Sequence, residues 1–241
     1  MTDGYQASGE FLHLLSEPAW QALRTPVGIA LRHTTPPDGP AVDIGAGTGL
    51  GTAVLAASHP AAEIVAVEPS SVLRAVLLSR VAADDDLRRR VTVVAGDALG
   101  VELPDRLGAV LAMNMIGHLD PAGRRTLWRR IAARLSPGAP LVVNLQPPAE
   151  PASIPETVFG TVGVGRYTYE GGGSAEPAGP DAVTWRMRYR VLGPDGSPVR
   201  ESTVEYAWHV LSVAGLRSEL AEAGLTTEVG PLDVVRAVRA D

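Results

Sequence analysis

The sequence predicts an α/β protein built on a doubly wound, mostly parallel sheet. The apolar run 41–44 stops in the glycine-rich turn 45–49, and a helical pattern follows, which is typical of a buried strand, a tight turn and a helix. Apolar runs and helical patterns then alternate up to about residue 147, as expected for parallel strands with helices on both faces. With 241 residues, the chain is long enough for one such core with additions.

The composition excludes several functional classes. The formal net charge of −6 argues against nonspecific nucleic-acid binding, which depends on neutralising phosphates. The chain has no cysteine, so disulfides, thiol nucleophiles and thiolate metal sites are excluded. The sequence contains neither 18 consecutive apolar residues nor a signal-peptide pattern, so we expect a cytoplasmic protein with no membrane partner.

The predicted core occupies residues 37–147 and follows an N-terminal helical cap, 1–36, that we expect to break near Pro18 and Pro26. Asp120 and Pro121 form an N-cap and first-turn pair that starts the helix after the fourth strand. The predicted strands of the core are residues 41–44, 63–67, 91–95, 109–113 and 140–145.

After the fifth strand the alternation fails. Residues 146–181 are rich in Pro, Gly and Glu and predict a long loop, and 183–192 with 199–208 predict a β-hairpin around the turn 193–198. We therefore expect an insertion, 148–209, that acts as a lid. Residues 210–241 then complete the core with a helix, 212–223, and a final strand pair, 226–230 and 233–238.

Acidic residues follow the first three strands at regular places. The first turn reads Asp-x-Gly-x-Gly-x-Gly from Asp43, whereas a dinucleotide fingerprint needs Gly-x-Gly-x-x-Gly. Glu68 ends the second strand about 25 residues later, close to the spacing of an acid that binds a ribose diol. Asp97 follows the third strand and Asn114 the fourth, so all four residues should meet in one crevice.

These residues resemble motif I and the strand-end acids of the class I S-adenosylmethionine (SAM) methyltransferases, over roughly residues 40–147. The resemblance implies a Rossmann-like, seven-stranded sheet with an antiparallel C-terminal strand, and SAM as cofactor. It also implies that Asp43 helps to hold the SAM amino group, that Glu68 binds the ribose and that Asp97 reads the adenine amino group. The cofactor-binding residues it implies are Asp43, Gly45, Ala46, Gly47, Gly49, Glu68, Pro69, Gly96, Asp97, Ala98 and Asn114.

Each acid also has a purely structural interpretation. Asp43 can cap its loop, Glu68 can be a favourable charge at a helix N-terminus, and Asp97 can form a Gly-Asp turn. The prediction of a cofactor site fails only if the structural interpretation is correct for all three acids at once.

His118, just past the fourth strand, is the candidate catalytic base, because an imidazole titrates near physiological pH. The alternative is that His118 only packs or binds the loop backbone. The remaining histidines are scattered, so we expect no metal site. His209, at the end of the predicted hairpin, is a weaker candidate for substrate contact, and a surface histidine is its alternative.

Aromatic side chains gather in the insertion and its hairpin, where they predict either a roof over a flat acceptor or cross-strand pairs. We favour cross-strand pairing for Trp185, Tyr189, Tyr206 and Trp208 and leave both interpretations open for Tyr167 and Tyr169. The candidate substrate residues are Tyr5, Phe11, Gln146, Tyr167, Tyr169, Trp208 and His209. We interpret the arginines 124, 125, 129, 130 and 134 as a solvated helix face and the charges 84–90 as local pairs.

The sequence therefore predicts a SAM-dependent methyltransferase that acts on the O or N atom, or alternatively a C atom, of a small molecule such as a secondary metabolite. Asn114 is not followed by Pro-Pro and an aromatic residue, as in base-amine and protein-glutamine methyltransferases, which also argues against nucleic acid as substrate. The rivals are a SAM-binding relative with a non-methylating reaction such as cyclisation, an NAD-dependent oxidoreductase and a non-catalytic subunit. A homodimer, with the insertion exchanged between protomers, is a further expectation.

Overall fold

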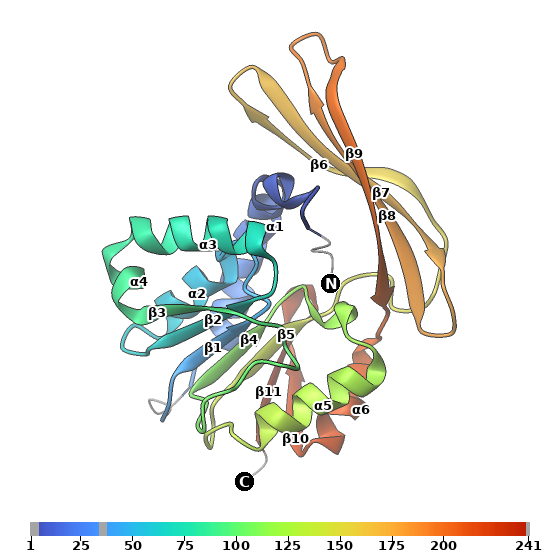
Figure 1. The fold of residues 1–241 in the computed structure, drawn as a ribbon. Helices are drawn as coiled ribbons and strands as arrows, with labels where there is room; N and C mark the ends of the chain where they lie inside the picture. Colours follow the sequence, from blue (N-terminus) through green and yellow to red (C-terminus); the bar gives the residue numbers. More distant parts are fainter. Residues whose placement is uncertain (1–4, 34–37, 240–241) are drawn as a thin grey trace.

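The computed structural model describes residues 5–33 and 38–239, whose strands form a seven-stranded and a four-stranded sheet (Figure 1). The larger sheet has the order β10-β11-β5-β4-β1-β2-β3. Its strands are β1 (Ala41–Ile44), β2 (Ile64–Glu68), β3 (Val91–Ala95), β4 (Ala109–Ala112), β5 (Leu141–Asn144), β10 (Leu225–Val229) and β11 (Val234–Arg239).

The directions of these strands confirm the predicted fold class. Strand β1 pairs in parallel with β2 on one side and with β4 on the other, and β3 and β5 extend the sheet in parallel. Strand β11 runs antiparallel to β5 and to β10, as expected for a final hairpin. The chain order therefore reverses between β1 and β4, where doubly wound sheets bind their ligands.

Helices cover both faces of this sheet. One face packs against α1 (Gly9–Ala30), α2 (Leu50–Ser58) and α3 (Ser71–Ala83), and the other against α5 (Pro121–Ala132) and α6 (Val213–Glu222). Successive strand residues point to opposite faces of the sheet. Ala41 therefore packs in the hydrophobic core under α1, α2 and α3, and Val42 packs in the core under α5 and α6. No helix within the described ranges combines the length and apolar content needed to span a membrane.

The predicted break of the N-terminal helix near Pro18 and Pro26 is wrong, because α1 continues through both prolines. Each proline removes one backbone donor from the helix. Burial of one apolar stripe offsets this loss, since Phe11, Trp20 and Val27 are buried against neighbouring elements.

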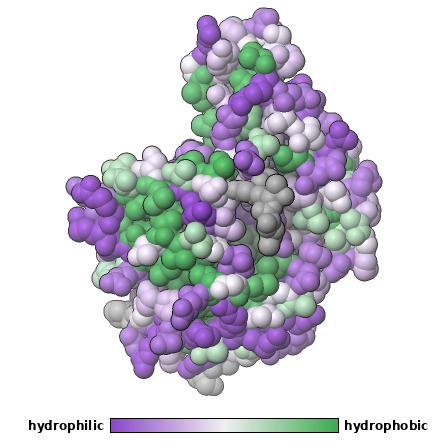
Figure 2. Space-filling view, viewed as in Figure 1, coloured by the Kyte–Doolittle hydropathy of each residue, from purple (hydrophilic) through white to green (hydrophobic). Residues whose placement is uncertain are grey.

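The long loop predicted for 146–181 is also wrong, because most of it forms two strands. Strands β6 (Ile154–Val164) and β7 (Tyr167–Pro177) precede the predicted hairpin of β8 (Ala182–Leu192) and β9 (Pro198–His209), and the four form one antiparallel sheet. Figures 1 and 2 show this sheet as a lobe that rises from the α/β core, with α1 near its base.

Helix starts follow the capping chemistry of the sequence. Asp120 accepts a hydrogen bond from Gly123 N at 2.6 Å and is followed by the proline that begins α5. The charges 84–90 form the short helix α4 (Asp85–Arg90), in which aspartates and arginines pair three and four positions apart. This helix accounts for the hydrophilic cluster at the left edge of Figure 2.

The prediction that Arg124 faces solvent is wrong. Its side chain is buried on α5 and pairs with Glu219 of α6 at 2.9 Å. Trp128 Nε1 donates to the same carboxylate at 3.0 Å. The other arginines of this helix are less buried, although Arg130 donates to backbone carbonyls of residues 98 and 99.

Candidate active site

A cavity of about 660 Å³ opens at the carboxyl ends of the parallel strands, next to the point where the strand order reverses. Its volume lies in the range usual for small-molecule sites. Among the described residues, those that line it come from the ends of β1, β2, β3, β4 and β5, from α1 and the segment before it, and from β8 and β9.

The glycine turn forms one wall of the cavity, and its three glycines differ in how closely other atoms approach them. All three have positive φ, at 71° for Gly45, 56° for Gly47 and 85° for Gly49. A Cβ on Gly45 would lie 2.9 Å from Met115, and one on Gly49 would lie 2.7 Å from Leu77. A Cβ on Gly47 would meet only an oxygen at 4.0 Å, so this glycine keeps backbone open to the cavity.

Glu68 joins the ends of β1 and β2. Its carboxylate accepts hydrogen bonds from Gly47 N and from Ser70 N, both at 2.8 Å, and its side chain is buried beside the cavity. Ser70 in turn caps α3. A carboxylate oxygen can accept more than one hydrogen bond, so this position suits an acid that organises the turn and also receives a ligand's hydroxyls.

Asp43 lies behind the glycine turn and is not among the residues that line the cavity. Its side chain is buried and accepts a hydrogen bond from Thr52 Oγ1 at 2.6 Å. Burial is the main reason why the pKa of Asp43 rises to about 7. Asp43 therefore holds the start of α2 against the glycine turn.

Asp97 and Ala98 line the cavity, whereas Gly96 does not. Asp97 Oδ1 accepts hydrogen bonds from Leu99 N at 2.9 Å and from Gly100 N at 2.8 Å. The turn-forming role considered for Asp97 is therefore present. Its side chain is still exposed at the cavity edge, so the turn leaves this carboxylate accessible from the cavity.

Asn114 occupies a strained position that a neighbouring strand supports. Its φ is 56°, and its backbone N donates to Asn144 Oδ1 at 2.7 Å while Asn144 Nδ2 donates back to Asn114 Oδ1 at 2.6 Å. Gln146 Nε2 donates to the same Asn114 oxygen at 3.1 Å. Asn114 and Gln146 both line the cavity. The supporting Asn144 was not predicted, because it lies inside a strand and belongs to no motif.

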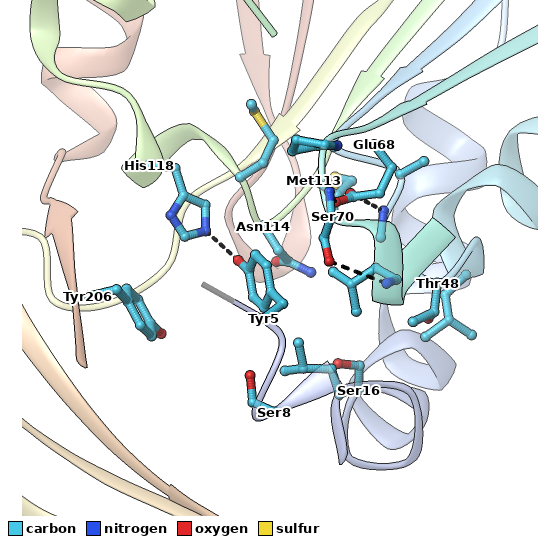
Figure 3. A pocket seen from close by; sticks show the side chains of 18 of the residues that line it. Tyr5, Ser8, Ser16, Thr48, Glu68, Ser70, Met113, Asn114, His118 and Tyr206 are labelled. Atoms are coloured by element: carbon cyan, nitrogen blue, oxygen red, sulfur yellow. Dashed lines mark hydrogen bonds between the residues drawn. The ribbon is translucent and has the colours of Figure 1, made fainter. Parts of the chain in front are cut away.

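His118 ends the short helix η1 (Ile116–His118) and faces the cavity from the side opposite Glu68 (Figure 3). Its Nε2 lies 2.7 Å from the Tyr5 hydroxyl. The edge of its ring meets Trp208, with ring centres 4.9 Å apart. Desolvation by these neighbours lowers the pKa of His118, although the ring remains accessible from the cavity.

The four-stranded sheet supplies an aromatic roof, which includes the predicted residue Trp208 but neither Tyr167 nor Tyr169. Tyr189, Tyr206 and Trp208 line the cavity, together with Val204. Tyr206 also pairs across the sheet with Trp185, so cross-strand pairing and roof formation are both present. A Cβ on Gly117 would lie 2.0 Å from Trp208, so the indole packs directly on the backbone of η1.

Four predicted substrate residues lie outside the cavity lining. Phe11 is buried and stacks on Tyr189 with ring centres 5.2 Å apart, and Tyr167 and Tyr169 pack in the same cluster between α1 and the four-stranded sheet. His209 follows Trp208 at the C-terminal end of β9 and lies 3.6 Å from Asp181. Phe11, Tyr167 and Tyr169 therefore attach the four-stranded sheet to α1, and none of the four residues lines the cavity.

Further lining residues went unnoticed in the sequence because they carry no motif. Helix α1 and the turn before it contribute four of them, which face the cavity at helical spacing, namely Ser8, Leu12, Ser16 and Trp20. The others are Thr48, Leu50, Ser70, Leu73, Met113, Met115 and Leu119.

Comparison with known proteins agrees with this architecture. A family model described as a methyltransferase domain matches residues 41–138. DesVI from Streptomyces venezuelae superposes with a TM-score of 0.77 at 19% identity, with 96% of each chain covered. CalS10 from Micromonospora echinaspora, an amino pentose methyltransferase solved with SAM bound, has a TM-score of 0.73 at 20% identity and 92% coverage of each chain.

A third solved structure, the sugar N-methyltransferase KedS8 from a Streptoalloteichus species, has a TM-score of 0.65 at 20% identity, with 98% of this chain and 91% of that chain covered. No curated protein sequence matches the chain. The matched region holds the glycine turn, Glu68, Asp97 and His118, which contribute to one part of the cavity lining. Residues 41–138 thus match a methyltransferase domain, and the chain shares the fold of these solved methyltransferase structures.

Proposed function

We propose that this enzyme transfers the methyl group of SAM to an amine nitrogen of a small natural-product molecule. The observation that carries the proposal is a single cavity with two chemically different ends. One end has the open glycine turn, Glu68 and Asp97, and the other has His118, Tyr5 and an aromatic roof. A cofactor and an acceptor can therefore meet in one cavity.

The cofactor end fits SAM by several independent features. Gly47 leaves room for a close ligand, Glu68 sits where ribose hydroxyls can donate to it, and Asp97 lies at the edge where an adenine can be read. Pro69, Ala98 and Asn114 complete this wall. When bound, SAM supplies a methyl group on a sulfonium, which is an activated donor, so the protein needs mainly to align the acceptor and exclude water.

The acceptor end has the groups that an amine needs. Tyr206 and Trp208 present aromatic faces and edges, which attract an alkylammonium ion. His118 is held unprotonated at neutral pH by its lowered pKa, so the imidazole can take the proton that the amine must lose. Tyr5 fixes the orientation of the ring through its hydrogen bond to Nε2.

The choice of nitrogen is supported by what similar structures are called. CalS10 is an amino pentose methyltransferase, KedS8 a sugar N-methyltransferase and MtfA a glycopeptide N-methyltransferase. A hydroxyl acceptor is the second candidate, favoured by His118 as a base next to Tyr5. The insertion, residues 148–209, would act as the acceptor-binding lid in either case.

The test is methyl transfer from labelled SAM to a matched panel of amino sugars and their hydroxyl analogues. Label in the amino compounds, with little in the hydroxyl compounds, is the expected result. Label only in the hydroxyl compounds would reverse the choice of atom. Cofactor binding without label in any acceptor would favour a non-methylating relative, and NAD binding in place of S-adenosylhomocysteine would favour an oxidoreductase.

A further inference from the structure

A line of three polar side chains runs from the surface of α3 through α1 to the glycine turn. Arg80 Nη2 lies 3.2 Å from His13 Nε2, and His13 Nδ1 lies 3.0 Å from Thr48 Oγ1. Arg80 also packs on the turn itself, because a Cβ on Gly49 would lie 3.3 Å from Arg80 Cδ. Thr48 is buried and lines the cavity at its cofactor end (Figure 3).

The direction of the hydrogen bonds is forced by Arg80. A guanidinium group only donates, so His13 Nε2 must accept and carry no proton. The neutral ring then carries its proton on Nδ1 and donates it to Thr48 Oγ1. The Thr48 hydroxyl hydrogen is left to point elsewhere, and this hydroxyl makes no second hydrogen bond to residues 5–33 and 38–239.

The charges around His13 agree with this assignment. Burial and the nearby Arg80 cation lower the pKa of His13, whereas Glu17 acts in the opposite direction. Glu17 is itself paired with Arg24 at 3.0 Å. Arg80 has no carboxylate partner within the described parts of the chain, and its Nε is buried without a hydrogen bond there.

We propose that Arg80, His13 and Thr48 form a donor chain that recognises the carboxylate at the amino-acid end of the cofactor, with Thr48 as the contacting residue and His13 and Arg80 as positioning residues. Three donors aligned in one direction polarise one another, and their positive end then faces the cavity. The inference rests on the proposed use of SAM. It adds a side-chain contact to the cofactor's carboxylate, a group that the backbone of the glycine turn alone does not distinguish from other ligands.

The test compares ligands that differ in the carboxylate. S-adenosylhomocysteine carries it, and 5′-methylthioadenosine has the same adenosine and thioether without the amino-acid end. Thr48→Val removes the hydroxyl at constant shape and should weaken S-adenosylhomocysteine about tenfold, as for a hydrogen bond to a charged group, without changing the affinity for methylthioadenosine. His13→Phe and Arg80→Met should act in the same direction.

Conservative variants separate recognition from loop structure. Thr48→Ser and Arg80→Lys keep the donors and should restore most of the affinity for S-adenosylhomocysteine. Equal weakening of both ligands in Thr48→Val would mean that the chain only supports the turn, and unchanged affinity for S-adenosylhomocysteine would remove the contact; either result overturns the inference. If the wild-type protein binds neither ligand, the SAM assignment itself fails, and the inference fails with it.

Discussion

The Tyr5 hydroxyl lies 2.7 Å from Nε2 of His118, although 113 positions separate the two residues in the chain. The contact joins the segment before α1 to the short helix after β4. It completes the acceptor end of the cavity, since the rings of Tyr206 and Trp208 lie on the other sides of the same imidazole. The candidate base His118 therefore lies inside the matched region 41–138, whereas Tyr5, which contacts it, lies outside that region.

His118→Ala should slow methyl transfer severalfold or more and leave the affinity for S-adenosylhomocysteine unchanged, because His118 lies at the acceptor end. Tyr5→Phe should give a smaller loss, since it removes only the hydrogen bond that orients the ring. Steady-state kinetics and calorimetry on the same preparations check both variants. Equal turnover of His118→Ala and wild type would eliminate His118 as the base.

The pH dependence of the rate should follow the same histidine. Burial lowers the pKa of His118 below its usual value of about 6.5, so the base form persists into mildly acidic solution. We expect turnover at saturating acceptor to fall only below about pH 6.5, and the limb caused by His118 to be absent in His118→Gln. An identical acid limb in His118→Gln would assign that titration to another group.

Gly117→Ala should detach the four-stranded sheet from the acceptor end. The new methyl group would lie 2.0 Å from the Trp208 ring, so the indole has to move. We expect a loss of about 1–3 kcal/mol in the free energy of unfolding, as for other overpacked sites, together with a raised KM for the acceptor. Gly163→Ala is the matched control, because nothing lies within 4 Å of its Cβ; a similar effect in both variants would contradict the role of the Trp208 contact.

Asp43 should make the protein less stable as the pH rises. Its pKa is raised to about 7 in the folded state from about 3.8 in the unfolded chain, so the folded state holds the extra proton. The stabilisation that Asp43 contributes is complete below about pH 3.8, the unfolded-state pKa, and is lost as the pH rises through about 7, the folded-state pKa. Urea unfolding across this window should show a smaller decline in Asp43→Asn than in wild type; parallel curves would show that Asp43 does not titrate as expected.

His59 should make the protein more stable as the pH rises, which is the opposite of the effect of Asp43. Burial and the adjacent His33 lower the pKa of His59 to about 4 in the folded state, whereas the unfolded chain titrates near 6.5. Its contribution is complete above 6.5 and is lost as the pH falls toward 4. Acid unfolding should therefore shift to lower pH in His59→Gln, and an unshifted transition would place the acid-sensitive group elsewhere.

The buried ion pair between α5 and α6 should be asymmetric to mutation. Glu219→Ala leaves the Arg124 guanidinium buried without its carboxylate and removes the acceptor for Trp128 Nε1, so we expect a loss of about 3–5 kcal/mol. Arg124→Met combined with Glu219→Leu should lose much less. Denaturant unfolding checks both proteins, and equal losses would contradict the desolvation argument.

The core of the fold was predictable because local signals and burial agree there. The apolar run before Gly45, the strand-end acids and the Asp120 cap each depend on neighbours in the chain, and the parallel direction of the strands follows from the alternation of strands and helices. The acceptor end was less predictable, because residues such as Ser16 and Val204 reach it only through packing of α1 and the four-stranded sheet.

The strands β6 and β7 were missed for a definable reason. Gly171, Gly172 and Gly173 suggest a loop, yet each lies within β7 where a side chain would collide. A Cβ on Gly171 would be 2.6 Å from Leu15, one on Gly172 2.9 Å from a backbone oxygen, and one on Gly173 2.7 Å from a methionine sulfur. These glycines serve close packing in a strand, which composition alone cannot distinguish from a flexible turn.

Titration of S-adenosylhomocysteine into the wild-type protein and into Glu68→Ala, followed by calorimetry, tests the central claim most directly. Glu68 connects the glycine turn to the end of β2 and is the proposed ribose ligand. We expect saturable binding to the wild type and affinity at least about tenfold weaker in a folded Glu68→Ala. Unchanged affinity in that variant would contradict the ribose assignment, and no binding to the wild type would contradict the account as a whole.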